Sequence, residues 1–168
     1  MSSRNRMEFG VDPHWQFLRD NYGMEEAFQF FGPYRGAGII PTLLDAHTVE
    51  VRMPLEPANK NYVGTQFGGS LYSMCDPFFM FILMDNLGAD YIVWDKSARI
   101  EFVQPGTGEV RVRFHIPEDE IQTVRDIVAR DRKTTRLYAA EIQGPSGEVV
   151  ARVTKELYIR KKRSATGN

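Results

Sequence analysis

Asp76 is the residue of this sequence that most clearly requires a chemical explanation. It lies within residues 71–84 (LYSMCDPFFMFILM), which otherwise form the most apolar stretch of the chain. A carboxylate in such surroundings costs several kcal/mol of desolvation unless it is paired, hydrogen-bonded or protonated. Groups of this kind gather at functional sites, so Asp76 is the first candidate for catalysis.

Gly68 and Gly69 directly precede this stretch and offer a second chemical element, unpaired backbone amides. A helix that begins at these glycines leaves its first N–H groups without intrahelical partners. Such amides can hold an anion or a polarised carbonyl, and glycine lets a ligand approach the backbone closely. An ordinary turn before a helix is the simpler interpretation of the pair taken alone.

Asp76 follows Gly69 by seven residues, a spacing that returns to nearly the same face of a helix. On one continuous helix the carboxylate could face the space that the glycine amides border. It could then attack a thioester, or activate water as a general base, while the amides hold the developing oxyanion. Pro77 supports a different interpretation, in which Asp76 is the N-cap of a helix that begins at the proline.

The other reactive or large side chains of this region have simpler interpretations. Cys75 has no His or Lys near it in the sequence, which favours a buried, inert thiol. Ser73 lacks an evident base and fits a packing role. The large apolar residues of the run are expected in the core rather than in contact with an acyl chain, namely Met74, Phe78, Phe81 and Met84.

Composition excludes several classes of function. A chain of 168 residues with 42% hydrophobic and 26% charged residues fits one soluble globular domain. Its net charge of −1 does not favour nucleic acid or an anionic membrane as a partner. One cysteine excludes an internal disulfide framework, and His14, His47 and His115 have no metal-ligand spacing, so neither metal nor cofactor is expected.

Targeting segments are not evident in the sequence. The first residues lead into a polar stretch rather than an apolar signal core. Residues 71–84 are shorter than the roughly 20 residues that a membrane-spanning helix needs. We therefore expect a cytoplasmic protein with no membrane segment, and a solvated basic tail at residues 160–163.

Periodicity predicts the elements that would position these residues. Residues 12–31 predict a Phe-rich helical arm that starts at Asp12-Pro13, breaks at Gly23 and closes at Gly32-Pro33. The apolar helix is expected to end at Gly88. Alternation over 109–116 places His115 on a solvent face. The remaining elements are strands at 39–44, 48–53, 91–103, 109–116, 134–143 and 148–160, a loop at 54–67 and a short helix at 117–130.

This order of elements is α+β. A helix that is apolar all round must be surrounded by protein, and an antiparallel sheet that curls around it provides the cover. We expect an N-terminal helical arm over residues 1–35 and a single domain over residues 36–168. The arm would serve as a lid over the sheet, as a pocket wall or as a subunit contact.

The stretch Asn61-Tyr62-Val63-Gly64-Thr65-Gln66-Phe67-Gly68-Gly69, followed by Asp76, resembles the signature of hotdog-fold thioesterases of the phenylacetyl-CoA thioesterase type. That signature runs Asn, two residues, Gly, two residues, His-Gly-Gly, and an acidic residue nine positions after the His. The chain departs from it where Phe67 takes the place of the histidine. It looks closest to an uncharacterised hotdog branch with the same Gly-Thr-x-Phe-Gly-Gly-x-Leu-Tyr and Asp-Pro combination. The matching positions are Asn61, Gly64, Gly68, Gly69 and Asp76.

The resemblance covers about residues 36–160 and implies a hotdog fold, a long central helix wrapped by a curved antiparallel sheet of about six strands. It implies homodimers, and dimers of dimers in many members, with active sites at the dimer interface. The implied substrate is an acyl-CoA or acyl-carrier thioester. The Gly69 amide would hold the thioester carbonyl, and Asp76 would act as general base or nucleophile.

We therefore predict an acyl-CoA thioesterase whose candidate catalytic residues are Asp76, Gly69 and Asn61. The candidate substrate-binding residues are Gly68, Phe67, Gln66, Thr65 and Ser73.

Three alternatives remain open at this point. Because Phe67 cannot hydrogen-bond a carbonyl, a non-catalytic protein that binds acyl thioesters or fatty acyl groups is the first. A hydratase or dehydratase on the same fold is weaker, since no histidine lies between His47 and His115. The Phe-rich arm would also suit a protein that acts only through its interactions.

Overall fold

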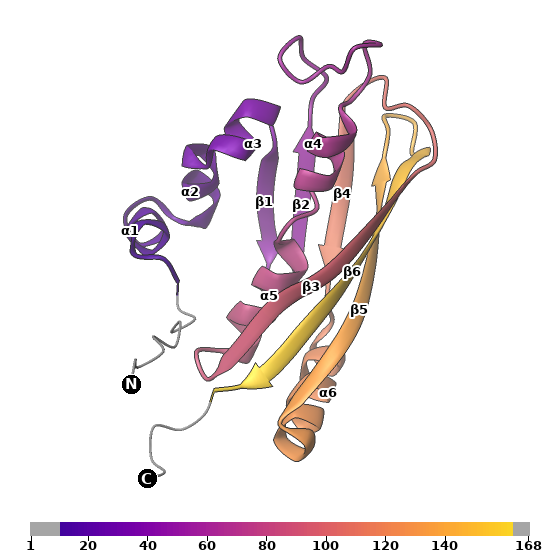
Figure 1. Cartoon of the computed structure of the whole chain (residues 1–168). Helices are drawn as coiled ribbons and strands as arrows, with labels where there is room; N and C mark the ends of the chain where they lie inside the picture. Colours follow the sequence, from indigo (N-terminus) through magenta and orange to yellow (C-terminus); the bar gives the residue numbers. More distant parts are fainter. Residues whose placement is uncertain (1–10, 163–168) are drawn as a thin grey trace, which may run out of the picture.

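Alternating apolar and polar residues produce a six-stranded antiparallel sheet in the part of the chain that the computed structural model describes, residues 11–162. Its strands are β1 (Ile40–Asp45), β2 (Thr48–Met53), β3 (Tyr91–Phe102), β4 (Val110–His115), β5 (Lys133–Gln143) and β6 (Val149–Lys161). They follow the spatial order β1-β2-β4-β5-β6-β3, so β1 and β3 are the two edges (Figure 1). The predicted α+β hotdog architecture is confirmed.

The strand β4 shows why the sheet has one buried face. Val110, Val112 and Phe114 are buried, whereas the residues between them and His115 are exposed. This confirms the predicted alternation and the exposed position of His115. The buried residues face the central helical segment, where Phe79 meets Phe114 edge to face with ring centroids 5.0 Å apart.

The central helical segment lies inside the curve of the sheet and consists of two helices, α4 (Gly68–Ser73) and α5 (Phe78–Leu87) (Figure 1). The prediction that Gly69 and Asp76 lie on one face of a continuous helix is therefore wrong. Pro77 has no N–H to donate and disfavours helical geometry at Asp76, so the helix is interrupted there. In the interruption the Asp76 N–H bonds to the Ser73 carbonyl at 3.2 Å, and the Asp76–Pro77 peptide is cis.

The N-terminal arm consists of α1 (Pro13–Tyr22), α2 (Met24–Phe30) and α3 (Gly32–Ala37). Asp12 caps α1, because its Oδ1 accepts a hydrogen bond from the His14 N–H at 2.9 Å, and the break at Gly23 is confirmed. The helix α2 ends at Phe30, as the predicted close at Gly32-Pro33 requires, but the helix that follows, α3, was not predicted. Proline suits the first turn of a helix, so Pro33 is accommodated in the first turn of α3, whose C-cap is Gly38 with φ +69°.

Phe28 anchors this arm to α5. Its side chain is 2% exposed, and its ring centroid lies 5.6 Å from that of Phe78 and 5.6 Å from that of Phe81. Within the arm it also meets Trp15 at 5.7 Å and stacks on Tyr34 at 5.5 Å. The arm therefore shares the hydrophobic core of the sheet and α5.

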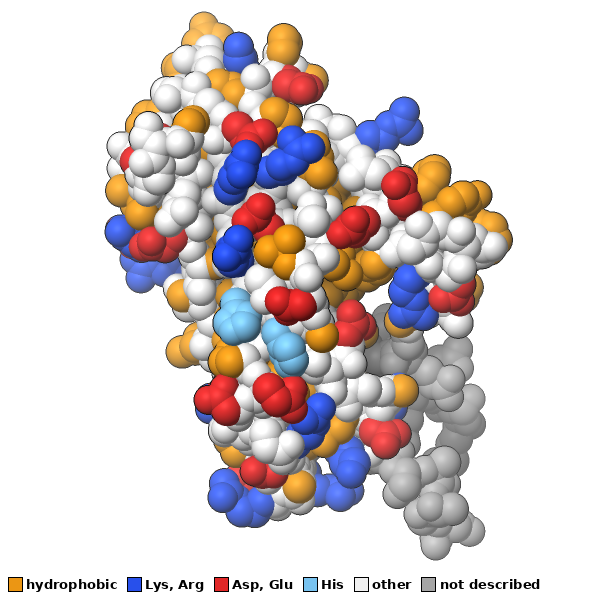
Figure 2. Space-filling view, turned by 180° about the vertical axis from the view of Figure 1, so that it is seen from behind, with side chains coloured by type: hydrophobic (Ala, Val, Ile, Leu, Met, Phe, Trp, Pro, Cys, Tyr) orange, Lys and Arg blue, Asp and Glu red, His pale blue; other side chains and the backbone are white. Residues whose placement is uncertain are grey.

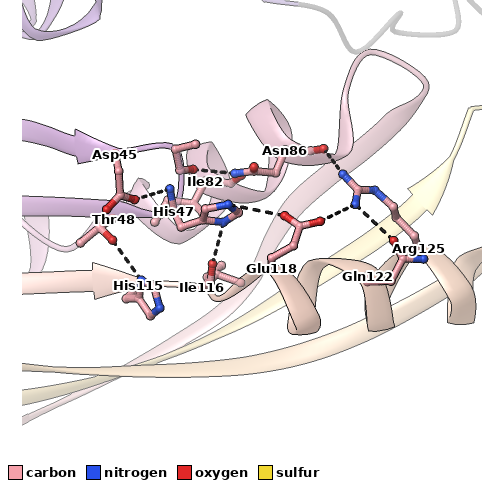
Figure 3. Close-up of polar contacts among 11 residues, drawn as sticks. Asp45, His47, Thr48, Ile82, Asn86, His115, Ile116, Glu118, Gln122 and Arg125 are labelled. Atoms are coloured by element: carbon pink, nitrogen blue, oxygen red, sulfur yellow. Dashed lines mark hydrogen bonds and ion pairs between the residues drawn. The ribbon is translucent and has the colours of Figure 1, made fainter.

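A polar network fastens the far end of α5 to the β1–β2 hairpin and to α6 (Glu118–Asp131) (Figure 3). The Asn86 side-chain amide donates to the carbonyls of Ala46 at 2.6 Å and Ile82 at 2.9 Å. The Asn86 carbonyl accepts from Arg125 at 2.6 Å. Because these bonds join α5 to the backbone of the β1–β2 hairpin and to a side chain of α6, the network fixes where α5 ends.

Two histidines near this network, His47 and His115, make structural contacts (Figure 3). His47 Nδ1 lies 3.0 Å from the Ile116 carbonyl, and its Nε2 lies 3.5 Å from Glu118. His115 Nδ1 lies 3.0 Å from the Thr48 hydroxyl. Within residues 11–162 no three His, Cys, Asp or Glu side chains are grouped as a metal site would need.

The charge distribution on the surface and the character of the helices bear on the kinds of partner expected from the sequence. Acidic and basic side chains are interspersed over the face seen in Figure 2, without a large area of one sign. Among the described helices, none combines the length and the apolar character that crossing a membrane requires.

Replacing Phe28 by Ala should destabilise the protein by about 3–5 kcal/mol, because it opens a cavity between the arm and α5. Phe30 lies two residues away in the same helix and is 56% exposed, so Phe30→Ala is the matched control with an expected loss below about 1 kcal/mol. Urea unfolding of both variants checks this. Equal losses would show that the arm is not anchored through Phe28.

Candidate functional site

Asp76 lies in the interruption between α4 and α5, where its carboxylate pairs with Lys155 of β6. The Asp76 side chain is 44% exposed, whereas that of Lys155 is 1% exposed. The N-cap of α5 is Pro77, without a side-chain cap hydrogen bond, so the interpretation of Asp76 as an N-cap is wrong. The pair thus combines a solvent-accessible carboxylate with a buried cation behind it.

Tyr34 of the arm holds the backbone of Asp76. Its hydroxyl donates to the Asp76 carbonyl, a group that a continuous helix would have used internally. Burial raises the pKa of Tyr34 well above its usual range, and the nearby charges of Asp76 and Cys75 add to the effect. The neutral hydroxyl is therefore a dependable donor, and Asp76 is fixed through both its side chain and its backbone.

Lys155 is the site residue that sequence reasoning missed. It stands on the inward face of β6, in series with Val153, Leu157 and Ile159, which are all fully buried. A charge at an inward position of an alternating strand was the available signal, because such a group needs a buried partner. The partner could not be identified from the sequence, since 79 residues separate Lys155 from Asp76.

Asp95 of β3 is a second carboxylate on the same cation. Its Oδ2 lies 3.0 Å from Lys155 Nζ, and its Oδ1 is buried without a hydrogen-bond partner among the described residues. Burial raises the pKa of Asp95; Lys155 opposes this rise and Asp76 adds to it. Burial acts to lower the pKa of Lys155, but the two carboxylates outweigh it and hold that pKa above its ordinary value.

A β-bulge at Lys96 places Asp95 beside Lys155. Asp95 pairs in register with Leu157, but Ala98, rather than Ser97, pairs with Lys155. On the outer face Glu156 accepts hydrogen bonds from Lys96 and from Ser97, both at 2.8 Å. The bulge is therefore fastened on one side of the sheet while Asp95 meets the buried cation on the other.

Cys75 is buried, and burial raises the pKa of its thiol to about 12, in agreement with the predicted inert thiol. The expectation that no lysine lies near Cys75 is wrong, because Lys155, which is distant in sequence, is close to it in the folded chain. Lys155 acts to lower the thiol pKa, but by less than burial raises it. The same Lys155 ammonium lies 5.4 Å from the centroid of the Tyr72 ring, a cation–π distance.

A cavity of about 340 Å³ lies between the arm and α5, with Asp76 and Pro77 in its wall. Of the apolar residues expected in the core, Met74 and Phe78 are buried in it, as predicted. Phe81 and Met84 are half-buried and line the cavity instead. Asp76 therefore borders an apolar space as well as solvent.

The predicted site residues before α4 form a self-contained loop. Asn61 Oδ1 accepts from the Val63 and Thr65 N–H groups, both at 3.0 Å, and its Nδ2 donates to the Thr65 hydroxyl at 2.8 Å. Gln66 is buried, and its Nε2 donates to the carbonyls of Met53 and Gly108 at 3.1 Å. The side chains of Asn61, Thr65 and Gln66 are thus engaged in shaping the loop and fastening it to the sheet.

Phe67 covers Gly69. A Cβ at Gly69 would lie 2.5 Å from the Phe67 ring, so only glycine permits this approach. Gly68 likewise lies under the Phe102 ring, where a Cβ would be 3.0 Å from it. Ser73 donates its hydroxyl to the Gly69 carbonyl at 2.9 Å. Packing against Phe67 and Phe102 is therefore sufficient to explain why glycines stand at positions 68 and 69.

Gly69 and Asp76 lie in different parts of one chain. The first hydrogen bond of α4 joins the Leu71 N–H to the Phe67 carbonyl at 3.0 Å, so the Gly68 and Gly69 amides precede it. Gly69 lies in the first turn of α4, whereas Asp76 lies beyond the last residue of that helix, Ser73. The cavity that Asp76 borders is not lined by either glycine.

Replacing Lys155 by Met should cost about 3 kcal/mol of folding stability, because two adjacent carboxylates would lose their shared cation. The same change at Lys96, whose side chain is 55% exposed and pairs with Glu156, should cost about 0–1 kcal/mol. Urea unfolding of the two variants measures the difference. A loss at Lys155 no larger than at Lys96 would show that the buried pair is not structurally important.

Asp95→Asn should alter how stability depends on pH. Since the folded-state pKa of Asp95 is raised, its favourable contribution is complete below its ordinary pKa of 3.8 and is lost as the pH rises through the raised value. The variant should therefore gain stability relative to the wild type between acidic and neutral pH. Parallel curves of unfolding free energy against pH for the two proteins would contradict this.

Comparisons with solved structures find the same fold in other proteins. A Pseudomonas aeruginosa protein of unknown function, described as a probable thioesterase, has a TM-score of 0.73 at 18% identity over 82% of this chain and 93% of its own. A Chlorobaculum tepidum protein of unknown function has a TM-score of 0.66 at 21% identity, covering 89% and 93%. A Haemophilus influenzae thioesterase has a TM-score of 0.61 at 11% identity, covering 84% and 94%.

These likenesses show the fold, since all the identities are low. No curated protein sequence matches the chain. A family model described as Domain of unknown function (DUF4442) matches residues 23–159. That match spans most of the chain and includes both Asp76 and Lys155, and the protein is therefore a member of the DUF4442 family, with the fold of hotdog thioesterases.

Proposed function

We propose that the protein hydrolyses an acyl thioester, with an acyl-CoA or an acyl-carrier thioester as substrate. The observation that carries the proposal is the Asp76–Lys155 pair, a partly exposed carboxylate backed by a buried cation in the wall of an apolar cavity. A thioesterase needs these parts together, because the acyl group is apolar and the attack on its carbonyl requires a base or a nucleophile. Structural neighbours described as thioesterases support the same reaction class.

Asp76 acts on the thioester carbonyl in one of two ways. As a general base it takes a proton from water while the water oxygen bonds to the carbonyl carbon, and the tetrahedral intermediate then expels the thiolate. As a nucleophile its oxygen bonds to that carbon and expels the thiolate, and water hydrolyses the resulting anhydride. Lys155 positions the carboxylate in both cases through Oδ1, which leaves Oδ2 for the reaction.

The Gly69 amide would hold the developing oxyanion. Because Gly69 and Asp76 of one chain are separated along the central segment, the two groups would come from different subunits of a homodimer, which could pair into a dimer of dimers. The edge strand β3 offers a surface for such pairing, since it is 12 residues long and carries the exposed Trp94 and Phe102.

The remaining predicted residues would shape the substrate site. Asn61 holds the loop before α4 in place, and Thr65 and Gln66 belong to that loop. Phe67 would present an apolar wall beside the Gly69 amide, with Gly68 and Ser73 at the start and end of α4. In this proposal the Phe67 ring occupies the position of the motif histidine without supplying its hydrogen bond to the carbonyl.

The second candidate function is binding of acyl thioesters or fatty acyl groups without hydrolysis. The observation that favours it is again Phe67, whose ring covers Gly69 and cannot donate to a carbonyl. The two functions share the apolar cavity and differ only in whether bound thioester is turned over.

Asp76→Asn should lower the rate of thioester hydrolysis by about 10²–10⁴-fold, because the amide can neither accept a proton nor attack. The measurement is release of free thiol from acetyl-, hexanoyl-, phenylacetyl- and palmitoyl-CoA. Asp126→Asn, at an exposed acid of α6, is the control and should leave the rate unchanged. Equal rates for the wild type and Asp76→Asn would remove the catalytic role, and wild-type binding without thiol release would establish the second function.

A further inference from the structure

We propose that the cavity between the N-terminal arm and α5 binds the acyl group of the thioester, so that the arm selects substrates with short, medium-length or aromatic acyl groups. This inference rests on the proposed function and adds to it the place and the size limit of the acyl group.

The walls of the cavity are mostly apolar and come from two parts of the chain. Trp15 of α1, Met24 and Phe28 of α2, and Phe31 form the side that belongs to the arm, and Met80 and Met84 belong to α5. Aromatic rings and methionines are typical of sites that accept apolar ligands, and unbranched methionine side chains adjust to the shape of the ligand.

The position of Asp76 gives the ligand a direction. Asp76 and Pro77 stand in the same wall as these apolar residues. The inference places the carbonyl end of the acyl group at Asp76 and its apolar end among the rings and methionines. The Tyr34 hydroxyl, which holds the Asp76 carbonyl, joins the arm to the same point.

The volume and the charges set an upper limit on the acyl group. A cavity of about 340 Å³ lies at the small end of the range for ligand pockets, which is roughly 300–1,000 Å³. Asp12, Arg19 and Asp85 also border it. Burying a long alkyl tail there would require it to displace or contact these charged groups, which favours shorter acyl groups.

Tryptophan fluorescence can test the cavity separately from hydrolysis. The chain has two tryptophans, Trp15 in the cavity wall and Trp94 on β3, so in the Trp94→Phe protein Trp15 alone reports. Octyl-CoA, a thioether that cannot be hydrolysed, should change this fluorescence on saturable binding, whereas CoA alone should not. No response of Trp15 to octyl-CoA that binds by calorimetry would overturn the inference.

Filling the cavity provides a second measurement. Met80→Phe should weaken octyl-CoA binding by about tenfold or more and leave ethyl-CoA binding nearly unchanged, because only the longer chain reaches the filled space. Leu44→Phe makes a comparable change at an exposed position of β1 and should affect neither ligand. Thermal unfolding of both variants verifies that they are folded.

The outcomes separate this inference from the proposed function. Octyl-CoA binding that depends on Met80, without hydrolysis of octanoyl-CoA, would retain the cavity as the acyl site and reject the hydrolase. Hydrolysis with a chain-length preference that Met80→Phe does not change would retain the hydrolase and reject the cavity. Palmitoyl-CoA as the preferred substrate of the wild type would also reject it.

Discussion

The burial of one lysine is the constraint on which the site depends. A lysine side chain that is 1% exposed is tolerated only with close partners for its ammonium group, and Lys155 has two carboxylates and an aromatic face. Each carboxylate requires a departure from regular structure. Asp76 reaches the cation from an interruption of the central helical segment, and Asp95 reaches it through a β-bulge. The irregularities of the helix and of the sheet thus meet at one buried charge.

The N-terminal arm extends this arrangement from the sheet to the cavity. Phe28 joins the arm to α5 through ring contacts, and the Tyr34 hydroxyl joins it to the Asp76 backbone. The arm therefore belongs to the surroundings of Asp76 as well as to the hydrophobic core. A substitution in the arm can alter the position of the carboxylate without touching it, since both contacts act through α5 or the interruption that precedes it.

Most of the fold could be predicted from local patterns. The alternation of Val110, Val112 and Phe114 identified β4 and its buried face, and Asp12 and Gly23 marked the start and the break of the arm. The two prolines of helical regions were harder to interpret. Pro33 follows the end of one helix, as predicted, but also lies in the first turn of another, and Pro77 interrupts a segment that apolar periodicity made continuous. Proline marks a boundary, but the elements on either side of it depend on packing.

The sequence by itself determined that a carboxylate is set in an apolar segment behind two glycines, because residue types and their spacing are local properties. Only the tertiary structure decided what that carboxylate meets. Lys155 lies 79 residues away on the far strand of the last hairpin, and a register shift in another strand brings Asp95 to it. Strand register and helix placement follow from how all the apolar faces are buried together, and no single segment carries that information.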